Sequence, residues 1–139
     1  MPNISTFMLC DSIQNIPTVD GGFVPGLFSP QLALRPRFIP GAFTFGVAVG
    51  IVGVDLTKEN ILRAEILNPE GKTVFAQADE MLKVVSKDDV HLPKDNQGFI
   101  LCTEIRNLGI ETEGNYKFVV YINNEKIGEK EIPIFKGMA

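Results

Sequence analysis

The chain has 139 residues, of which 45% are hydrophobic and 22% are charged, and its net charge is −4. This balance is typical of one globular domain and excludes a disordered chain. The acidic balance and the scattered Lys and Arg disfavour a nucleic-acid-binding protein, because such proteins neutralise phosphates with a basic face. No dense basic run would attract an anionic membrane, and no apolar run reaches the roughly 18 residues of a membrane span. We therefore expect a single domain over residues 1–139, with no nucleic-acid or membrane partner.

The N-terminus lacks the positive segment and the long apolar segment of a signal peptide, so we expect a cytoplasmic protein. Cys10 and Cys102 are the only cysteines. In a reducing compartment, cysteines in apolar strand contexts behave as small buried hydrophobes. A disulfide between them would need adjacent strands and an oxidising compartment.

The first expected strand runs from Thr6 to Ile13. The next region, Ile16 to Pro40, combines five prolines with many large apolar residues, among them Phe23, Leu27, Phe28, Leu32, Leu34 and Phe38. Because proline cannot donate to a sheet ladder, a strand here is short, bulged or at an edge. We expect an edge strand near residues 22–28, followed by an extended apolar crossing to the core.

The segment from Phe43 to Ile51 has large apolar side chains at every second position, and only Thr, Gly and Ala between them. Successive side chains of a strand point to opposite faces, so this pattern predicts a central strand with one bulky face in the core. The other face is nearly bare and lets another backbone, sheet or subunit approach closely.

Further strands follow at short intervals. Residues 61–67 and 72–78 predict a hairpin, because the intervening Asn-Pro-Glu-Gly is a strong turn signal. Residues 77–85 fit either a strand or a helical turn, and residues 86–97 read as a polar surface loop. Residues 98–107, 116–122 and 125–135 alternate as strands, and Asn123-Asn124 fits a tight turn between the last two. Seven to eight short strands predict an all-β, antiparallel immunoglobulin-like sandwich, with a partly open barrel as the alternative.

No catalytic, metal or cofactor motif accompanies these strands. His91 is the only histidine, and it lies in the polar loop without a nucleophile elbow nearby. Asp88, Asp89 and Asp95 do not have the spacing of a calcium-binding loop, and the adjacent lysines oppose a cation. We expect an exposed His91, a solvated acidic loop, no cofactor and no enzymatic activity. A hydrolase would have to use His91.

The apolar region from Ile16 to Pro40 is the best lead to function. Its large residues either cover one end of the core or form an exposed patch that marks a partner or subunit contact, and the sequence leaves both open. Within it, Arg35-Pro36-Arg37 presents two guanidinium groups that can grip a carboxylate or phosphate, or can lie along apolar surface with their heads in water. The candidate binding residues are Phe23, Phe28, Arg35, Arg37 and Phe38.

The layout of the chain resembles a group of small bacterial β-sandwich domains of unknown function. The matching pieces are the opening strand Phe7-Met8-Leu9-Cys10-Asp11, the return from Gly22 to Phe28, the approach from Arg35 to Phe38, and the hairpin from Ala64 to Lys72. Pro25 departs from the continuous strand expected there. The resemblance implies a sandwich of bacterial or phage origin and brings no catalytic residue.

Together these observations predict a non-enzymatic protein-binding or assembly module of a bacterial or phage system. Its partner would be another protein or a second copy of the chain, held by an apolar patch or by an edge strand that the partner extends. The alternative is a protein that binds a small anionic ligand through Arg35 and Arg37. The identity of the partner, the oligomeric state and the pathway do not follow from the sequence.

Overall fold

The structure is a computed structural model that describes residues 2–55, 57–77, 80–82 and 93–137. In these residues, the regular elements are nine strands and the short 3-10 helix η2. Their bounds are β1 Asn3–Pro17, β2 Phe23–Gln31, β3 Gly41–Val52, β4 Asn60–Leu67, β5 Thr73–Ala76, β6 Glu80–Leu82, η2 Lys94–Asn96, β7 Gly98–Ile110, β8 Gly114–Ile122 and β9 Glu125–Ile134. Within the described ranges, no helix is long and apolar enough to cross a membrane.

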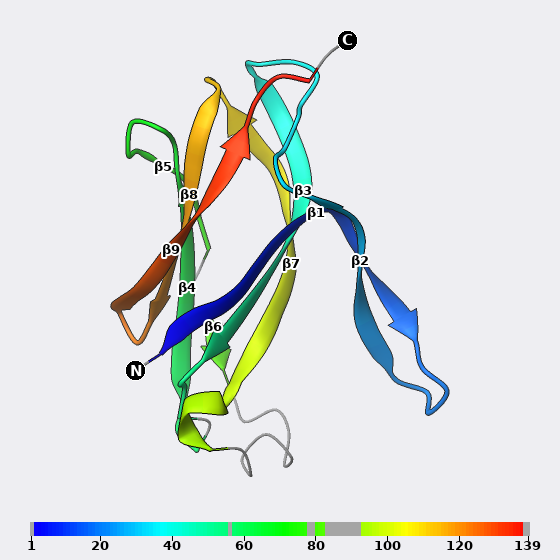
Figure 1. Cartoon of the computed structure of the whole chain (residues 1–139), viewed down its shortest axis with the longest axis vertical. Coiled ribbons are helices and arrows are strands. Elements are labelled where there is room, and N and C mark those ends of the chain that lie inside the picture. Colours follow the sequence, from blue (N-terminus) through cyan, green and yellow to red (C-terminus); the bar gives the residue numbers. More distant parts are fainter. Residues whose placement is uncertain (1, 56, 78–79, 83–92, 138–139) are drawn as a thin grey trace.

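The strands form two antiparallel sheets that pack face to face (Figure 1). One sheet has the order β2-β1-β3-β7, and the other has the order β5-β4-β8-β9, with β6 also paired to β4. This confirms the predicted antiparallel sandwich and not the alternative barrel. The ambiguous segment near residues 77–85 contributes β6, a three-residue strand, in its described part.

Connectivity and one hydrogen bond give the sandwich its immunoglobulin-like character. Strands β1, β3 and β7 form one layer, and β4, β8 and β9 form the other. The chain changes layer between β3 and β4, between β6 and β7, and between β7 and β8, as it does at the corresponding points of the immunoglobulin fold. Tyr116 lies near the start of β8, is almost completely buried, and donates its hydroxyl to the Thr112 carbonyl at 2.8 Å. A tyrosine that bonds back to the preceding corner is a hallmark of these sandwiches.

The core lies between the two sheets and follows the predicted alternation. In β3, four side chains are at most 1% exposed and face the opposite sheet: Phe45, Val47, Val49 and Ile51. Strands β4 and β8 supply the other half of the core, also at alternate positions. Period-two alternation therefore located the central strand and its buried face correctly.

Two predicted turns have the expected geometry. Asn123 and Asn124 adopt φ values of 53° and 66° between β8 and β9, which asparagine tolerates in tight hairpins. In the β4–β5 turn, the Asn68 side-chain oxygen accepts from the Glu70 and Lys72 amides. Local side-chain chemistry therefore fixes both connections.

The bare face of β3 is filled within its own sheet. A Cβ atom on Gly46 would lie 2.6 Å from Cys10 Sγ and 2.9 Å from Ile13 Cγ1, both from β1. A Cβ on Gly50 would lie 3.1 Å from Ser5 Oγ. In the described part of the chain, the close approach that these glycines permit is therefore made by side chains of the neighbouring strand.

Candidate functional site

The first two strands leave the sandwich as a two-stranded ribbon. Strand β1 is longer than predicted and pairs with β3 only through Asn3–Cys10, whereas its second half pairs only with β2. Figure 1 shows this hairpin projecting away from the two sheets. We call residues 12–28 the arm. Its second strand, β2, matches the predicted edge strand, and no layer packs over the arm in the described structure.

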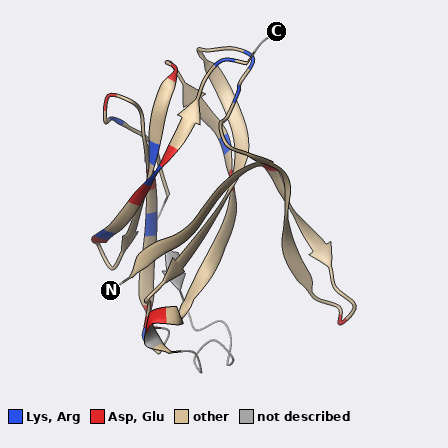
Figure 2. Ribbon diagram, in the orientation of Figure 1, with Lys and Arg blue, Asp and Glu red and all other residues tan. Residues whose placement is uncertain are grey.

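The arm is apolar and nearly free of charge. From Ser12 to Leu34 the sequence holds one charged residue, Asp20, in the turn at the tip of the arm. Figure 2 shows the contrast with the sandwich, where charged residues occur along β4, β8 and β9. Several large side chains of the arm and its base are exposed by 41% or more: Met8, Ile16, Val19, Phe23, Val24, Phe28 and Leu32.

Three of these side chains share one face of the arm. In the β1–β2 ladder, Ser12 pairs with Phe28 and Ile16 pairs with Val24, so even-numbered residues of both strands lie on the same side within the arm. We call these residues the apolar stripe: Ile16, Val24 and Phe28. Their exposed fractions are 41%, 47% and 41%. Met8 and Leu32 lie at the base of the arm, and Leu32 follows the end of β2.

Within the arm, the stripe has a preformed shape. A Cβ on Gly26 would lie 2.3 Å from Ile16 Cδ1 and 3.3 Å from Phe28 Cε2. Ile16 therefore folds across the backbone of Gly26 towards the Phe28 ring, which only glycine permits at that position. The result is a compact apolar ridge on a two-stranded ribbon.

Polar contacts close the tip of the arm. The Thr18 hydroxyl donates to the Asp20 carboxylate, and the Gly22 amide donates to Thr18 Oγ1 at 3.1 Å. The hydrogen bond from Thr18, with a second from the Gly22 amide, lowers the pKa of Asp20. Gly21 has a φ of 87°, a left-handed value that glycine adopts without strain. The tip is therefore a defined turn.

The root of the arm is tied to the sandwich. The Ile13 amide donates to Glu104 Oε1 at 3.3 Å, across β3 to the far strand β7. The Ile13 side chain lies over Gly46, and together with Cys10 it fills the bare face described above. These contacts fix the direction in which the arm leaves the sheet.

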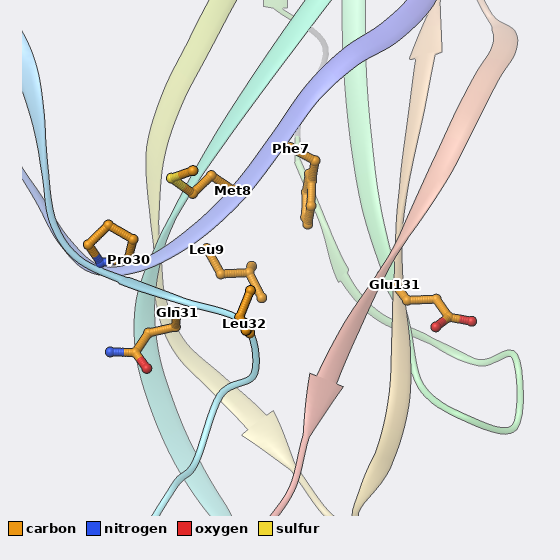
Figure 3. Close-up of a pocket in the computed structure, with 7 residues that line it drawn as sticks. All are labelled: Phe7, Met8, Leu9, Pro30, Gln31, Leu32 and Glu131. Atoms are coloured by element: carbon orange, nitrogen blue, oxygen red, sulfur yellow. The ribbon is translucent and has the colours of Figure 1, made fainter.

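A groove lies where the arm meets the sandwich. It has a volume of about 230 Å³, and Figure 3 shows the side chains that surround it, from β1, from the end of β2 and from β9. Most of its lining is apolar, and the Glu131 carboxylate lies at its rim. The residues that line the groove are Phe7, Met8, Leu9, Pro30, Gln31, Leu32 and Glu131. The arm therefore meets the sandwich beside a concave, largely apolar surface.

The predicted binding residues fall into two groups. Phe23 and Phe28 lie on the arm, with exposed fractions of 68% and 41%. The other three lie in the crossing between β2 and β3, at the end of the sandwich that holds the C-terminus (Figure 1). There, Arg35 and Arg37 are exposed on either side of the buried Pro36, and Phe38 is 74% exposed. The five residues therefore do not form one continuous surface.

One of the two arginines lines a hollow. Arg35 and Lys136 are among the residues around a hollow of about 310 Å³ beside the C-terminal segment, whereas Arg37 is not. Leu34 and Pro36, which alternate with the two arginines in the sequence, are both buried and cover the core. The region from Ile16 to Pro40 thus contains both alternatives that the sequence left open: core covering near Leu34, and exposed apolar surface on the arm.

Most residues that the sequence offers for catalysis or metal binding are outside the described ranges. His91, Asp88 and Asp89 are outside the described residues, and Asp95 lies in η2. Among the residues that the structure does describe, no group of three or more His, Cys, Asp and Glu side chains is placed to hold a metal ion.

Both cysteines are free thiols. Cys10 is fully buried as predicted, whereas Cys102 is only half-buried. They lie on β1 and β7, on either side of β3, opposite Gly46 and Ala48 respectively. Two strand spacings and a shift of two residues put their Cα atoms about 12 Å apart, beyond the span of a disulfide. Burial raises the pKa of both thiols, and the Asp11 carboxylate adds to the rise at Cys10.

Sequence reasoning missed two residues of the stripe: Ile16 and Val24. Alternation alone cannot separate an apolar strand face inside a core from one on a projecting ribbon. A usable signal was nevertheless present, because a run of more than twenty residues with a single charge is unusual in a chain that is 22% charged.

Two solved structures are similar to this chain at low sequence identity. The structure is similar to part of a glycosyl hydrolase family 2 member from Bacteroides cellulosilyticus, with 10% identity, a TM-score of 0.49, and coverage of 94% of this chain and 15% of that one. It is also similar to an immunoglobulin-like protein from Pseudomonas aeruginosa, with 12% identity, a TM-score of 0.43 and 97% coverage of each chain. This chain thus spans only a small part of the first of these proteins.

No curated protein matches the sequence. A family model described as a family of unknown function, DUF6941, matches residues 5–135. This match covers nearly the whole chain and includes the arm, its base and both sheets. The chain therefore belongs to the DUF6941 family.

Proposed function

We propose that this protein is a non-enzymatic binding or assembly module, and that the arm is its binding element. The observation that carries the proposal is the apolar stripe, which is exposed along a ribbon that no described part of the chain covers. The bacterial or phage setting and the cytoplasmic location predicted from the sequence belong to the same proposal.

Energetics support a partner for the arm. An isolated two-stranded hairpin is marginally stable in water at best, because it lacks a second layer in which to bury its side chains. Contiguous exposed apolar patches on soluble proteins mark interaction sites. Burial of Phe28 and its neighbours against a partner would therefore stabilise both the arm and the complex.

The partner would pack on the face of the arm and not along its edge. Strand β2 is the free edge of its sheet, but Pro25 and Pro30 both lack the amide that an added strand requires. The exposed side chains of the stripe offer the larger contact. This favours side-chain packing over the strand addition that we also considered from the sequence.

The test is affinity capture from native-host cells, with the captured proteins identified by mass spectrometry. The bait is the full chain, and it is compared with a Phe23→Ser/Phe28→Asp variant. Phe135→Asp is the matched control, because Phe135 is 44% exposed, close to the 41% of Phe28, and lies outside the arm. We expect the arm variant to lose a protein that the wild type and the control retain. Equal capture by all three baits would refute the arm as the binding element.

A second candidate is the binding of a small anionic ligand. Arg35 and Lys136 line one hollow, so a carboxylate or phosphate there would meet two cations. Native mass spectrometry of the purified chain tests this candidate. A retained anion that is lost in Arg35→Ala, but not in Arg37→Ala, would support it, and an anion-free protein would count against it.

A further inference from the structure

We infer that the outer edge of β7 pairs with β7 of a second copy of this chain, antiparallel and about a two-fold axis at Leu101. The pairing joins the β2-β1-β3-β7 sheets of two chains into one continuous sheet. This inference goes beyond the proposed function of the arm, because it concerns another surface and does not depend on the arm.

Three of the four strands that end the two sheets carry features that hinder the addition of another strand. Strand β2 contains Pro25, β5 has only four residues, and the end of β9 already bonds to Leu34. The exposed positions of β9 are also charged: Glu125, Lys126, Glu129, Lys130 and Glu131. Strand β7 differs, because its 13 residues include no proline or lysine, and no charge between Gly98 and Thr103.

The backbone of β7 offers a regular row of hydrogen-bonding groups on its outer side. The Gln97 carbonyl accepts from the Gly53 amide at 2.8 Å, so it points toward the end of β3. The bonding groups of an antiparallel strand alternate between its two sides, and the β3–β7 register does not shift over this part. Ile100, Cys102 and Glu104 therefore direct their amides and carbonyls away from β3. No described strand pairs with that side of β7.

The core beside this edge is incomplete. Phe99 and Leu101 pack against the core but are only half-buried, whereas Ile51 and Val49, opposite them on β3, are at most 1% exposed. On the outer face, Ile100 is 71% exposed. A strand added to β7 would cover apolar surface on both faces, and its burial would stabilise the pair.

The side chains of β7 fit a second copy in one register. In a two-fold interface, residue i contacts residue j and j contacts i, and each hydrogen-bonded pair must join two residues whose groups point outward. An axis at Leu101 meets this condition, because it pairs Ile100 with Cys102 and Leu101 with itself. Apolar side chains then meet on both faces. An axis at Cys102 would instead place Ile100 opposite the Glu104 carboxylate.

The one acidic side chain in the paired segment has room. In this register Glu104 lies opposite Gly98 of the other chain, which has no side chain. Gly98 and Gly50 line a hollow of about 450 Å³ there. The two Glu104 positions lie about 20 Å apart along the ladder, roughly twice the Debye length at 0.1 M salt. Two chains of net charge −4 can therefore pair along this segment without close contact between its acids.

Sedimentation equilibrium of the full chain tests the inference. We expect the wild type to be a dimer at micromolar concentration, and both Ile100→Lys and Cys102→Pro to raise the dissociation constant about tenfold or more. The proline removes an amide that points away from β3, so the β3–β7 ladder keeps its hydrogen bonds. Phe38→Lys should leave the constant unchanged, because Phe38 is 74% exposed, close to the 71% of Ile100, and lies outside β7. A wild type that is monomeric at about 100 μM, or a dimer that Ile100→Lys leaves intact, would overturn the inference.

Disulfide cross-linking tests the register. In a Cys102→Ser background, Leu101→Cys places two thiols in a non-hydrogen-bonded pair at the axis, where Cα atoms lie about 4.5 Å apart and can be bridged. Thr103→Cys is the control, because its two copies would lie about 13 Å apart. The remaining thiol, Cys10, is buried in both variants. Leu101→Cys should form a covalent dimer on mild oxidation much faster than Thr103→Cys. Equal rates, or a faster reaction of Thr103→Cys, would refute the axis at Leu101.

The outcomes separate this inference from the proposed function. The Phe23→Ser/Phe28→Asp variant should remain dimeric, and Ile100→Lys should still capture the partner of the arm. A dimer that the arm variant dissociates and Ile100→Lys does not would refute the β7 edge and assign self-association to the arm. Equal capture by all baits, with a dimer that Ile100→Lys dissociates, would refute the arm and support the β7 edge.

Discussion

The sandwich and the arm are both built from β-strands, but their outward-facing side chains differ in polarity. On the outer face of the β4–β8–β9 layer, outward-facing positions carry paired charges. Arg63 lies 2.6 Å from Glu65 and 4.0 Å from the centre of the Tyr121 ring. On the arm, the corresponding positions carry Ile16, Val24 and Phe28. The outer face of the sandwich is polar and remains hydrated, whereas the exposed face of the arm is apolar and would be stabilised by burial.

The difference shows which part of the molecule is complete by itself. The sandwich encloses a core of nearly inaccessible side chains and has no buried side-chain nitrogen or oxygen without a hydrogen bond among its described residues. The arm has neither a core nor a covering layer. The sandwich therefore provides the stability of the fold, and the arm provides a surface whose stabilisation comes from association.

The largest expected effect contrasts one phenylalanine from each region. Phe45→Ala removes a fully buried ring and should lower the free energy of unfolding by about 3–5 kcal/mol. Phe23→Ala removes a ring that is 68% exposed on the arm and should change it by no more than about 0.5 kcal/mol. Urea unfolding of both variants measures the difference. Similar losses in the two variants would mean that the arm is part of the folding core.

The next effect concerns the root of the arm. In Gly46→Ala the new Cβ would lie 2.6 Å from Cys10 Sγ and 2.9 Å from Ile13 Cγ1, so these side chains must shift. We expect a loss of about 1–3 kcal/mol in unfolding free energy. Gly109→Ala is the control, because nothing lies within 4 Å of its Cβ position. An unchanged stability in Gly46→Ala would show that Ile13 does not hold the arm against the sheet.

A smaller effect is expected at the tyrosine corner. Tyr116→Phe leaves the buried ring in place but removes its 2.8 Å hydrogen bond to the Thr112 carbonyl. The expected loss of stability is about 1 kcal/mol. In Tyr121→Phe the lost bond is a longer one, 3.4 Å to Glu65, so thermal unfolding should show a smaller change. A larger loss of stability in Tyr121→Phe than in Tyr116→Phe would show that the hydrogen bond of the tyrosine corner does not stabilise the fold.

The smallest effect depends on pH. Burial raises the pKa of Cys10 in the folded state, so the unfolded thiol ionises first as the pH rises. The unfolded state then binds fewer protons than the folded state, and stability falls above the ordinary thiol pKa of about 8.5. Cys10→Ala should reduce this decline between pH 8 and pH 10, measured by urea unfolding. A decline of the same size in that variant would assign it to other groups.

Local patterns predicted the sandwich well, because each one depends on short-range geometry. The alternation from Phe43 to Ile51 identified the central strand, and Asn123-Asn124 identified a hairpin turn. The projection of the arm was not predictable in the same way. Whether Ile16 or Phe28 meets a second layer depends on which strands pair across the whole chain, and alternation does not carry that information. For the same reason, the sequence analysis placed Phe28 and Arg37 in one candidate surface, whereas the structure places Phe28 on the arm and Arg37 in the crossing between β2 and β3.

The central claim is that the arm associates while the sandwich folds without it. In a variant with residues 14–26 replaced by Asn-Gly, the Ile13–Leu27 pair closes a short hairpin and keeps the root of the arm. Urea unfolding should show a cooperative transition for this variant, and in affinity capture it should lose the protein that the full chain retains. Capture of that protein at the wild-type level, or the absence of a cooperative transition, would contradict the account.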